Sequence, residues 1–461
     1  MKMEKALAKF IYTTEYTDLP QETIAVIKLQ LIALYGATIA ATNAEGCKEI
    51  ADYVRGISEK EEATVLMHGG KVSAQAAAFA NSVMGRALDI DDHISPGVHL
   101  GSAVIPAALA AAELTGGCFG KEILTALAVG IEVALRLNLE DKDLDGFDPT
   151  GIIAIFASTA AAAKLMKLTE EQILHALALA FNRCGGSFQS NVDGSLAVRV
   201  IEGWVAQMGV ECARLAKIGI TGPHNFLDGV YSFFYLYARE DKNRGYVVKD
   251  LGQKWHIDTI NFKKYPSCGL TQGSTELILK MMREHNFSAA DVEKIVVRIP
   301  TYAYKLVGKF SIGNNLKVSA QFSVGYCVAN AVTRKDITLS QFEAEQIREP
   351  IVQKFLSERV DVINDPSLSQ NHYASGILVT LTNGVVLEGS IDIPPGTPDN
   401  PLSYEEHRKR FYDCIEFANL PWLNSEKGDS ILYTLMNMEK LEDIDTLISL
   451  LLPENSKMPV W

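Results

Sequence analysis

Between two alanine-rich apolar stretches, the chain reads Ala87-Leu88-Asp89-Ile90-Asp91-Asp92-His93-Ile94-Ser95-Pro96-Gly97-Val98-His99. Three carboxylates and two imidazoles fall within these thirteen residues. Ionisable groups are costly to bury unless they are paired, so such a cluster usually serves chemistry or a structural ion network. Pro96 and Gly97 indicate an irregular turn rather than a helix face. The apolar flanks predict that buried helices hold this loop rigidly, which favours the chemical interpretation.

The sequence on both sides of this loop, from residue 4 to about 250, is dominated by helical patterns. Abundant alanine in it allows close contact between helices. Thr169-Glu170-Glu171-Gln172 is typical of a capping box, and Ile152–Ala163 is apolar nearly all round, as expected for an interior helix. Apolar residues recur at helical spacing in the segments 21–41, 72–84, 103–115, 121–137, 151–167, 169–183 and 203–218.

The composition changes near residue 255, where β-like segments appear. Val296–Ile299 and the run 376–392 favour strands, and Asn383-Gly384 within the second run is the strongest short signal for a hairpin. Helical stretches at 269–284, 320–333 and 339–355 lie between these strands. This part of the chain therefore predicts an α+β domain.

A proline-rich segment at 394–401 ends the α+β domain, and Ser403-Tyr404-Glu405-Glu406 then predicts a capping box and a return to helix. The last helices have no strands to join, so we expect them to pack on the first helices. The predicted domains are a helical domain at 1–258, an α+β domain at 259–398, and C-terminal helices at 399–461 that return to the helical domain.

Composition and charge exclude several classes of protein. The 461 residues carry a formal net charge of −13, which argues against nucleic-acid and anionic-membrane partners. The seven scattered cysteines form no CxxC pair, which fits a reducing compartment and argues against a zinc cluster. The first five residues do not resemble a signal peptide, and no 18-residue apolar run is free of charge or helix-breaking residues. We expect a soluble, cytoplasmic protein.

Six blocks of the sequence, in order, resemble the MmgE/PrpD family, which includes 2-methylcitrate dehydratase, cis-aconitate decarboxylase and iminodisuccinate epimerase. The resemblance implies a mainly α protein, with a large all-helical domain formed by both chain ends plus a smaller α+β lid domain. It also implies a homodimer that needs no metal or organic cofactor and binds a small anionic carboxylate between its domains. The blocks are 88–92 with His99 and Pro106-Ala107, 146–151, 194–203 with 215–223, 262–268, 322–326, and 395–401.

Two of these blocks depart from the family pattern. Many members have Gly-Phe-His-Pro where this chain has Asp148 in place of the histidine, and Lys-Arg-Leu-His where it has Val198-Arg199-Val200-Ile201. A citrate-like trianion requires several cationic partners in a dry cleft. The altered residues suit a smaller dianion at least as well. Transferred by position, the family's active site falls on Asp89, His93, His99, Lys263, Cys268 and Tyr326.

The four candidate catalytic residues also have structural interpretations. His99 is either a hydrogen-bonded core histidine or a general acid or base. Asp89 caps or ends a helix, orients a histidine, or accepts a proton, whereas Asp91 and Asp92 are interpreted as structural. Lys263 is a surface residue or a point charge for a substrate carboxylate. Tyr326 packs in a core or donates a proton or hydrogen bond to the substrate.

The candidate substrate-binding residues are His93, Asp148, Arg199, Cys268 and Lys264. Asp148 either repels an anionic substrate, pairs with Lys263 or His99, faces solvent, or caps a helix starting at Pro149. Arg199 is a candidate bidentate clamp for a carboxylate. Cys268 is interpreted as lining the pocket and not as a nucleophile, and Lys264 is the less favoured member of its lysine pair.

These residues predict a cofactor-independent lyase, first a hydro-lyase acting on a small hydroxy-di- or tricarboxylate. His99 and Tyr326 would divide the roles of base and acid, and Lys263 would stabilise the enolate-like charge. A racemase or epimerase, or a decarboxylase, acting on a related polycarboxylate is the alternative within the same chemistry. A non-catalytic ligand-binding paralogue is the alternative from a different class.

Overall fold

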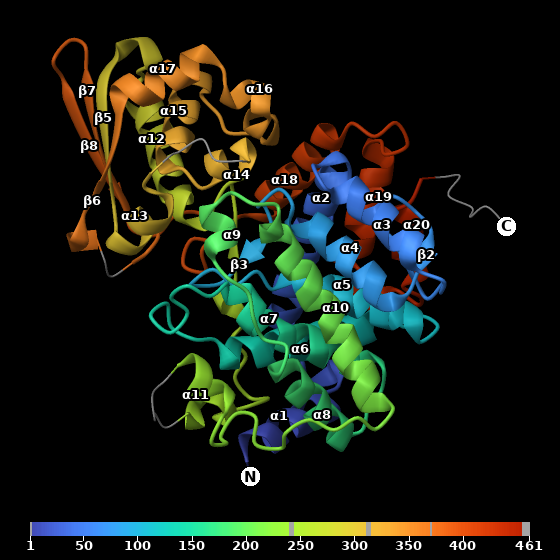
Figure 1. Cartoon of the computed structure of the whole chain (residues 1–461). Helices are drawn as coiled ribbons and strands as arrows, with labels where there is room; N and C mark the ends of the chain where they lie inside the picture. The colour runs from blue at the N-terminus through green and yellow to red at the C-terminus, as the bar shows by residue number, and fades with distance from the viewer. Residues whose placement is uncertain (1, 239–243, 310–314, 369–370, 454–461) are drawn as a thin grey trace.

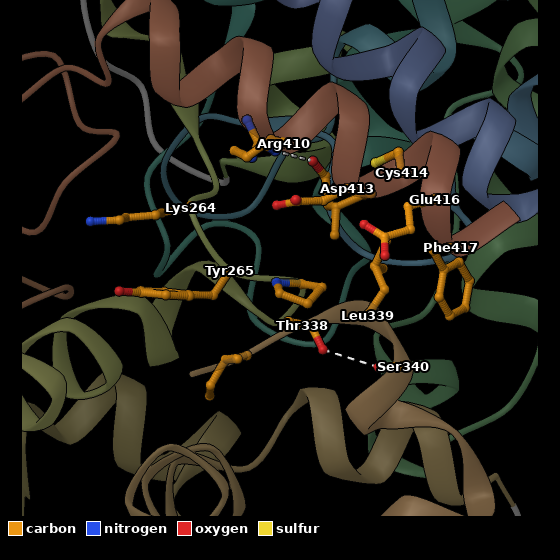
Figure 2. A pocket seen from close by; sticks show the side chains of 13 residues that line it. Lys264, Tyr265, Thr338, Leu339, Ser340, Arg410, Asp413, Cys414, Glu416 and Phe417 are labelled. Atoms are coloured by element: carbon orange, nitrogen blue, oxygen red, sulfur yellow. Dashed lines mark hydrogen bonds between the residues drawn. The ribbon is translucent and has the colours of Figure 1, made fainter. Parts of the chain in front are cut away.

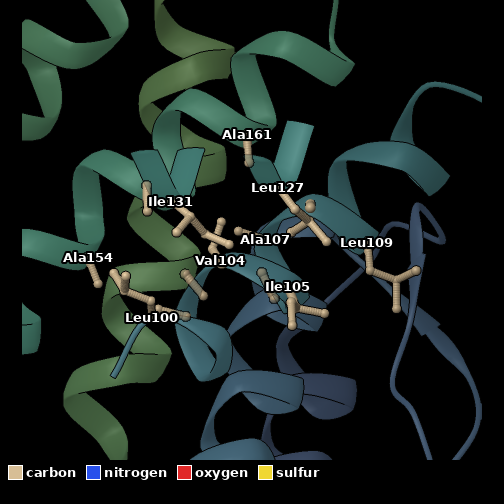
Figure 3. Packing of buried hydrophobic residues seen from close by; sticks show 14 of the residues in the cluster. Leu100, Val104, Ile105, Ala107, Leu109, Leu127, Ile131, Ala154 and Ala161 are labelled. Atoms are coloured by element: carbon tan, nitrogen blue, oxygen red, sulfur yellow. The ribbon is translucent and has the colours of Figure 1, made fainter. Parts of the chain in front are cut away.

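Small side chains let helix backbones approach closely, and the alanine-rich middle of the helical domain forms its core. In the computed structural model, which describes residues 2–238, 244–309, 315–368 and 371–453, three helices lie at this centre. They are α5 (Gly101–Leu114), α6 (Gly120–Leu137) and α7 (Pro149–Leu165). Figure 3 shows buried side chains from all three helices packing together, among them Val104 of α5 and Leu127 of α6.

The remaining elements of this domain come from the N-terminal part of the chain and from its C-terminal end (Figure 1). Helix α18 packs along α2, and its Phe411 and Ile415 are part of the helical core. The mainly α fold class predicted from the sequence is therefore confirmed. These elements are α1 (Met3–Thr13), α2 (Gln21–Ala40), α3 (Cys47–Ile57), β1 (Ala63–Thr64), β2 (Lys71–Val72), α4 (Ala74–Arg86), α8 (Glu170–Phe181), α9 (Gln189–Val192), α10 (Ala197–Lys217), α11 (Phe233–Tyr237), α18 (Tyr404–Ala418), α19 (Ser425–Met436) and α20 (Asp445–Leu450).

The smaller α+β lid domain contains a four-stranded sheet with the order β6-β5-β7-β8, seen at the upper left of Figure 1. The predicted hairpin at Asn383-Gly384 joins β7 to β8 as antiparallel neighbours. The parallel edge strand β6 was not predicted, because its exposed residues give only a short and weak apolar pattern. The elements are α12 (Gln272–His285), β5 (Val292–Ile299), α13 (Thr301–Val307), α14 (Leu316–Gln321), α15 (Val324–Arg334), α16 (Ala344–Ile347), α17 (Pro350–Arg359), β6 (Val360–Asn364), β7 (Ser375–Leu381) and β8 (Val386–Ile391).

Local signals explain most of the helix ends. Both predicted capping boxes are present, at Thr169 before α8 and at Ser403 before α18. The helical stretch predicted over 339–355 is divided into three pieces, because the chain there forms a short 3-10 turn, α16 and then α17. Pro350 lacks a backbone N–H, so it cannot continue a preceding helix but is well suited to start a new one.

Helix α2 is part of the core, although the segment Gln21–Asn43 is by length and composition apolar enough to cross a membrane. Of the most apolar 18 residues of this segment, 78% are buried inside the protein. The amide of Gln30, on the buried part of α2, donates to Asp92 Oδ2 at 2.8 Å. A polar side chain on a buried helix needs a hydrogen-bond partner inside the protein, and Asp92 provides that partner for Gln30.

The start of α5 tests how tightly this region is packed. A Cβ atom on Gly101 would lie 2.0 Å from Asp92 Oδ1, and the other oxygen of Asp92 is held by Gln30 and by the Gly101 N–H. Overpacking of this kind typically costs about 1–3 kcal/mol. We expect Gly101→Ala to lower the free energy of unfolding by at least that amount in urea denaturation.

Gly56 in α3 is the matched control for Gly101. Among the described residues, no atom lies within 4 Å of a Cβ placed at Gly56. Gly56→Ala should therefore raise the free energy of unfolding by about 0.5–1 kcal/mol, because alanine favours helix. Equal stability of the two variants would show that Asp92 can move aside.

Candidate active site

A pair of two-residue strands brings the acidic loop to the lid domain. β3 (Asp92–His93) pairs antiparallel with β4 (Asn261–Phe262), so that His93 lies opposite Asn261. Lys263 follows β4 directly, and its Nζ donates to Asp89 Oδ1 at 2.8 Å and to the Asp89 carbonyl at 3.0 Å. Segments that are about 170 residues apart in sequence are thereby joined into one site at the domain junction.

The backbone of Asp89 directs its side chain. Asp89 has a φ of 56°, in the left-handed region that aspartate tolerates better than most residues. The chain turns there just after α4 ends at Arg86. From the lid side, Gln321 Nε2 donates to the neighbouring Leu88 carbonyl at 2.6 Å, so the turn is held from both domains.

A buried ion network surrounds Asp89. Arg86 Nη1 pairs with Asp89 Oδ1, and Arg86 Nε donates to Glu202 Oε1 at 3.0 Å. Lys263 Nζ lies 3.7 Å from Asp91 Oδ1. Burial alone would raise the pKa values of Asp89 and Asp91, but other groups hold both below the ordinary carboxyl range: Lys263 and Arg86 act on Asp89, and His99, followed by Arg86 and Lys263, acts on Asp91. Both carboxyls are therefore ionised at neutral pH.

His99 is held by Asp91. His99 Nδ1 lies 2.9 Å from Asp91 Oδ2, and the backbone N–H of His99 donates to Thr150 Oγ1 at 2.9 Å. Burial, followed by the charge of Arg86, lowers the pKa of His99 below its ordinary value. A neutral ring that donates from Nδ1 to the carboxylate keeps Nε2 as an acceptor. His99 is therefore placed as an oriented base.

The side chains of this network line a cavity between the two domains. The cavity is partly open to solvent, and its volume is about 50 Å³. His93 lies at its wall with ring centroids 6.2 Å from His99 and 5.7 Å from Tyr373. The lining residues are Arg86, Asp89, His93, Pro96, Gly97, His99, Asp148, Thr150, Phe188, Asn191, Glu202, Lys263, Cys268, Gly269, Leu270, Leu306, Phe322 and Tyr373.

Six of the nine predicted site residues meet in this cavity: Asp89, His93, His99, Asp148, Lys263 and Cys268. Asp148 also caps α7, since its Oδ1 accepts from the Gly151 N–H at 3.1 Å and Pro149 occupies the first helical position. One of the alternatives considered for Asp148 is thus confirmed, and burial raises the pKa of its carboxyl. Burial also raises the pKa of the Cys268 thiol to about 11, which does not favour a nucleophilic role.

The structure contradicts the predicted substrate contact of Tyr326. Its ring lies in the lid core against Phe342, and its hydroxyl donates to the Gln341 carbonyl at 2.6 Å. Helix α15 is apolar over much of its surface, so the sequence pattern alone does not tell which way Tyr326 points. Tyr373 is the tyrosine that lines the cavity.

The predicted carboxylate clamp at Arg199 is also wrong. Arg199 Nη1 donates to the Glu45 carbonyl at 2.5 Å, at the turn before α3 and beside the Cys47 thiol. The guanidinium therefore supports the packing of two helix ends. Arg86 is the arginine that reaches the cavity.

Lys264 faces a second, larger cavity behind the acidic loop, and its prediction as a substrate-binding residue of the site is wrong in position (Figure 2). Its Nζ pairs with Glu276 at 2.9 Å and with Glu406 at 3.6 Å. Arg410 of α18, which also lines this cavity, donates to the Ile90 carbonyl at 2.8 Å. Arg410 thus holds the loop from behind.

Sequence reasoning missed five polar groups at the cavity: Arg86, Thr150, Asn191, Glu202 and Tyr373. It also assigned the orienting role to Asp89, whereas Asp91 contacts His99. Glu202 gave the one signal that could have been used. It is a carboxylate on the buried face of α10, and a buried charge needs a partner.

Asp89, Asp91 and His99 also form a group of potential metal ligands, with ligand atoms within 4.8 Å of one another. Lys263 and Arg86 lie against both of these carboxylates. A metal ion would have to displace these cations or tolerate their charge. The donor set therefore fits an internal ion network better than a metal site.

Comparison with known proteins matches both parts of the chain to one family. The N-terminal domain of the MmgE/PrpD family matches residues 5–245, and its C-terminal domain matches residues 265–420. The chain is 26% identical to cis-aconitate decarboxylase of Homo sapiens over 97% of this chain and 94% of that protein. It is 24% identical to cis-aconitate decarboxylase of Aspergillus terreus (strain NIH 2624 / FGSC A1156), over 84% of this chain and 83% of that protein. It is 23% identical to 2-methylcitrate dehydratase of Escherichia coli (strain K12), over 58% of this chain and 57% of that protein.

Proposed function

The chain belongs to the MmgE/PrpD family, and we propose that it is an enzyme that removes a proton from a carbon next to a carboxylate. The observation that carries this proposal is the contact of His99 Nδ1 with Asp91 at 2.9 Å, in a cavity that also holds Lys263 and Arg86. A neutral, oriented imidazole beside cations is the arrangement that carbon-acid chemistry requires.

His99 would act as the base. Its lowered pKa keeps the imidazole unprotonated near neutral pH, and Asp91 would stabilise the imidazolium that forms when Nε2 accepts the proton. A positioned base of this kind contributes about 10²–10⁴ to the rate. Asp91 would act through His99 and is therefore a positioning residue.

Lys263 would stabilise the negative charge that develops on the substrate carboxylate as the proton leaves. Two of its three N–H groups go to Asp89, which fixes the ammonium at the cavity wall and leaves one donor for the substrate. Because Lys263 is only 1% exposed, its charge acts in a poorly screened environment.

The acid that completes the reaction would be Tyr373. Its hydroxyl belongs to a cavity-lining side chain of the lid domain, and burial raises the pKa of the phenol, so that it keeps its proton. Loss of a hydroxyl protonated by Tyr373 would make the reaction a dehydration, and the enzyme a hydro-lyase. The cis-aconitate decarboxylases match more of this chain than the dehydratase does, which supports decarboxylation as an alternative. In that reaction the bond between carbon and a carboxylate breaks, carbon dioxide leaves, and an acid of the cavity gives a proton to the carbon.

A second candidate function is epimerisation. His93 and His99 lie on the same cavity with ring centroids 6.2 Å apart, and burial lowers the pKa of both imidazoles. In a two-base epimerisation one neutral imidazole would remove the proton, and the other, protonated when the substrate is bound, would return one to the same carbon from another direction.

Proton NMR in deuterated buffer, with a panel of small carboxylates, tests the proposal. Exchange of a carbon-bound proton for deuterium without net product would identify an epimerase, and new alkene signals would identify a dehydratase. Release of carbon dioxide would identify a decarboxylase. No exchange and no product with any compound, while binding is still measurable, would contradict the enzymatic proposal and favour a binding protein.

A further inference from the structure

Glu202 is a buried carboxylate that the catalytic scheme above does not use. It lies in α10, is 1% exposed, and lines the cavity beside His99 and Lys263. Its Oε1 accepts from Arg86 Nε at 3.0 Å. Its Oε2 is buried and has no hydrogen-bond partner among the residues that the structure describes. Buried polar atoms in native proteins nearly always have a partner, so this oxygen points to a ligand.

The charges around the cavity are already balanced without a ligand. Arg86 and Lys263 both lie against the ionised Asp89, and both also face Asp91. Asp148 at the start of α7 adds a further carboxyl near Glu202. His93 and His99 are neutral, because burial lowers their pKa values. No excess positive charge therefore remains among these groups for a ligand with several carboxylates.

The carboxyl oxygens without a partner at the cavity are acceptors when their groups are ionised, and both ring nitrogens of His93 are also buried without a partner among the described residues. Asp89 Oδ2 is buried without a hydrogen-bond partner in the described part of the chain, as is Glu202 Oε2. A further carboxylate brings only acceptors, whereas a protonated amine brings three donors and a positive charge. Burial, opposed by Arg86 and reinforced by Asp148, raises the pKa of Glu202 to about 8, and a cation against it would reverse this shift.

We propose that the cavity takes a small carboxylic acid that also carries a protonated amine, with the ammonium group against Glu202 and a carboxylate against Lys263. This inference rests on the proposed function for the location of the site and for the role of Lys263. Glu202 then determines specificity because, once the ammonium group favours its ionised form, its free oxygen accepts a hydrogen bond from the amine.

Calorimetric binding at pH 7 tests the inference with pairs of compounds that differ by one ammonium group: succinate with aspartate, and glutarate with glutamate, with tricarballylate as the trianion. We expect the amino compound of at least one pair to bind about tenfold or more tightly than its partner, as a charge-assisted hydrogen bond predicts. Ionisation of Glu202 on binding should release up to about one proton, measured as a dependence of the binding heat on the buffer.

Glu202→Gln should remove both the preference for the amino compound and the proton release. Glu211→Gln is the matched control, because Glu211 lies on the same helix and bonds to Gln75 away from the cavity. Equal or tighter binding of the deaminated compounds or of tricarballylate, or an unchanged preference in Glu202→Gln, would overturn the inference, as would no binding by any amino compound. These outcomes leave the proposed function standing if deuterium exchange occurs with another carboxylate. Loss of exchange with retained amine preference would overturn the proposed function alone.

Discussion

Replacing His99 with asparagine should lower kcat/KM by about 10²–10⁴ for any substrate that shows deuterium exchange. Asparagine is close to histidine in size and can still donate to Asp91, so the fold should be retained. What is lost is the ring nitrogen that accepts the proton while Asp91 holds the other nitrogen at 2.9 Å. The measurements are steady-state kinetics and the exchange rate by proton NMR, with circular dichroism to check the fold.

His175→Asn provides the comparison for His99→Asn. His175 is a buried histidine of α8, and it packs against His224 outside the cavity. Its replacement should leave kcat/KM unchanged. If His99→Asn instead keeps full activity, the role of the base would pass to His93, which lines the same cavity.

The pH dependence follows from the direction of the shift at His99. The active form of a base is the unprotonated one, so kcat/KM should be constant above the pKa of His99 and fall as the pH drops through it. Because burial and the charge of Arg86 lower this pKa, the fall should lie below pH 6.5. An acid limb centred above 6.5 would show that His99 is not the titrating base.

Much of the fold could be predicted because its signals are local. Apolar spacing identified the central helices α5 to α7, and Asn383-Gly384 identified the β7–β8 hairpin. Thr169 and Ser403 identified two helix starts. Each of these signals needs only a few neighbouring residues, so no knowledge of the tertiary structure is required.

The site could be predicted in part, because the direction of a side chain depends on backbone turns and distant contacts. The left-handed turn at Asp89 directs that carboxylate to Lys263 and leaves Asp91 to contact His99, which a row of acidic residues does not reveal. Tyr326 lies on a helix buried on most sides, so apolar periodicity could not show that its hydroxyl points away from the cavity. The β3–β4 pairing, which joins the two halves of the site, involves only two residues in each strand.

Replacing Lys263 with methionine should reduce both activity and stability. Loss of the charge that meets the developing enolate should lower kcat/KM by about 10²–10³. The substitution also leaves the buried Asp89 with Arg86 as its remaining cationic partner. Removing one partner of a buried ion pair costs about 3–5 kcal/mol. We expect the free energy of unfolding to fall by about 3 kcal/mol, because Arg86 still pairs with Asp89.

Lys264→Met is the matched control, since the neighbouring Lys264 is more exposed and pairs with Glu276 on the far side of the loop. It should change kcat/KM by less than about twofold and the unfolding free energy by less than about 1 kcal/mol, as for an exposed ion pair.

The stability effect of Lys263→Met has a defined pH dependence. Lys263 helps to lower the pKa of Asp89, so this pair stabilises the fold fully above about pH 4 and loses its contribution as the carboxyl is protonated. The difference in unfolding free energy between the wild type and Lys263→Met should therefore be largest at neutral pH and shrink toward pH 3. A difference that stays constant or grows as the pH falls would show that Lys263 acts through packing and not through the charge of Asp89.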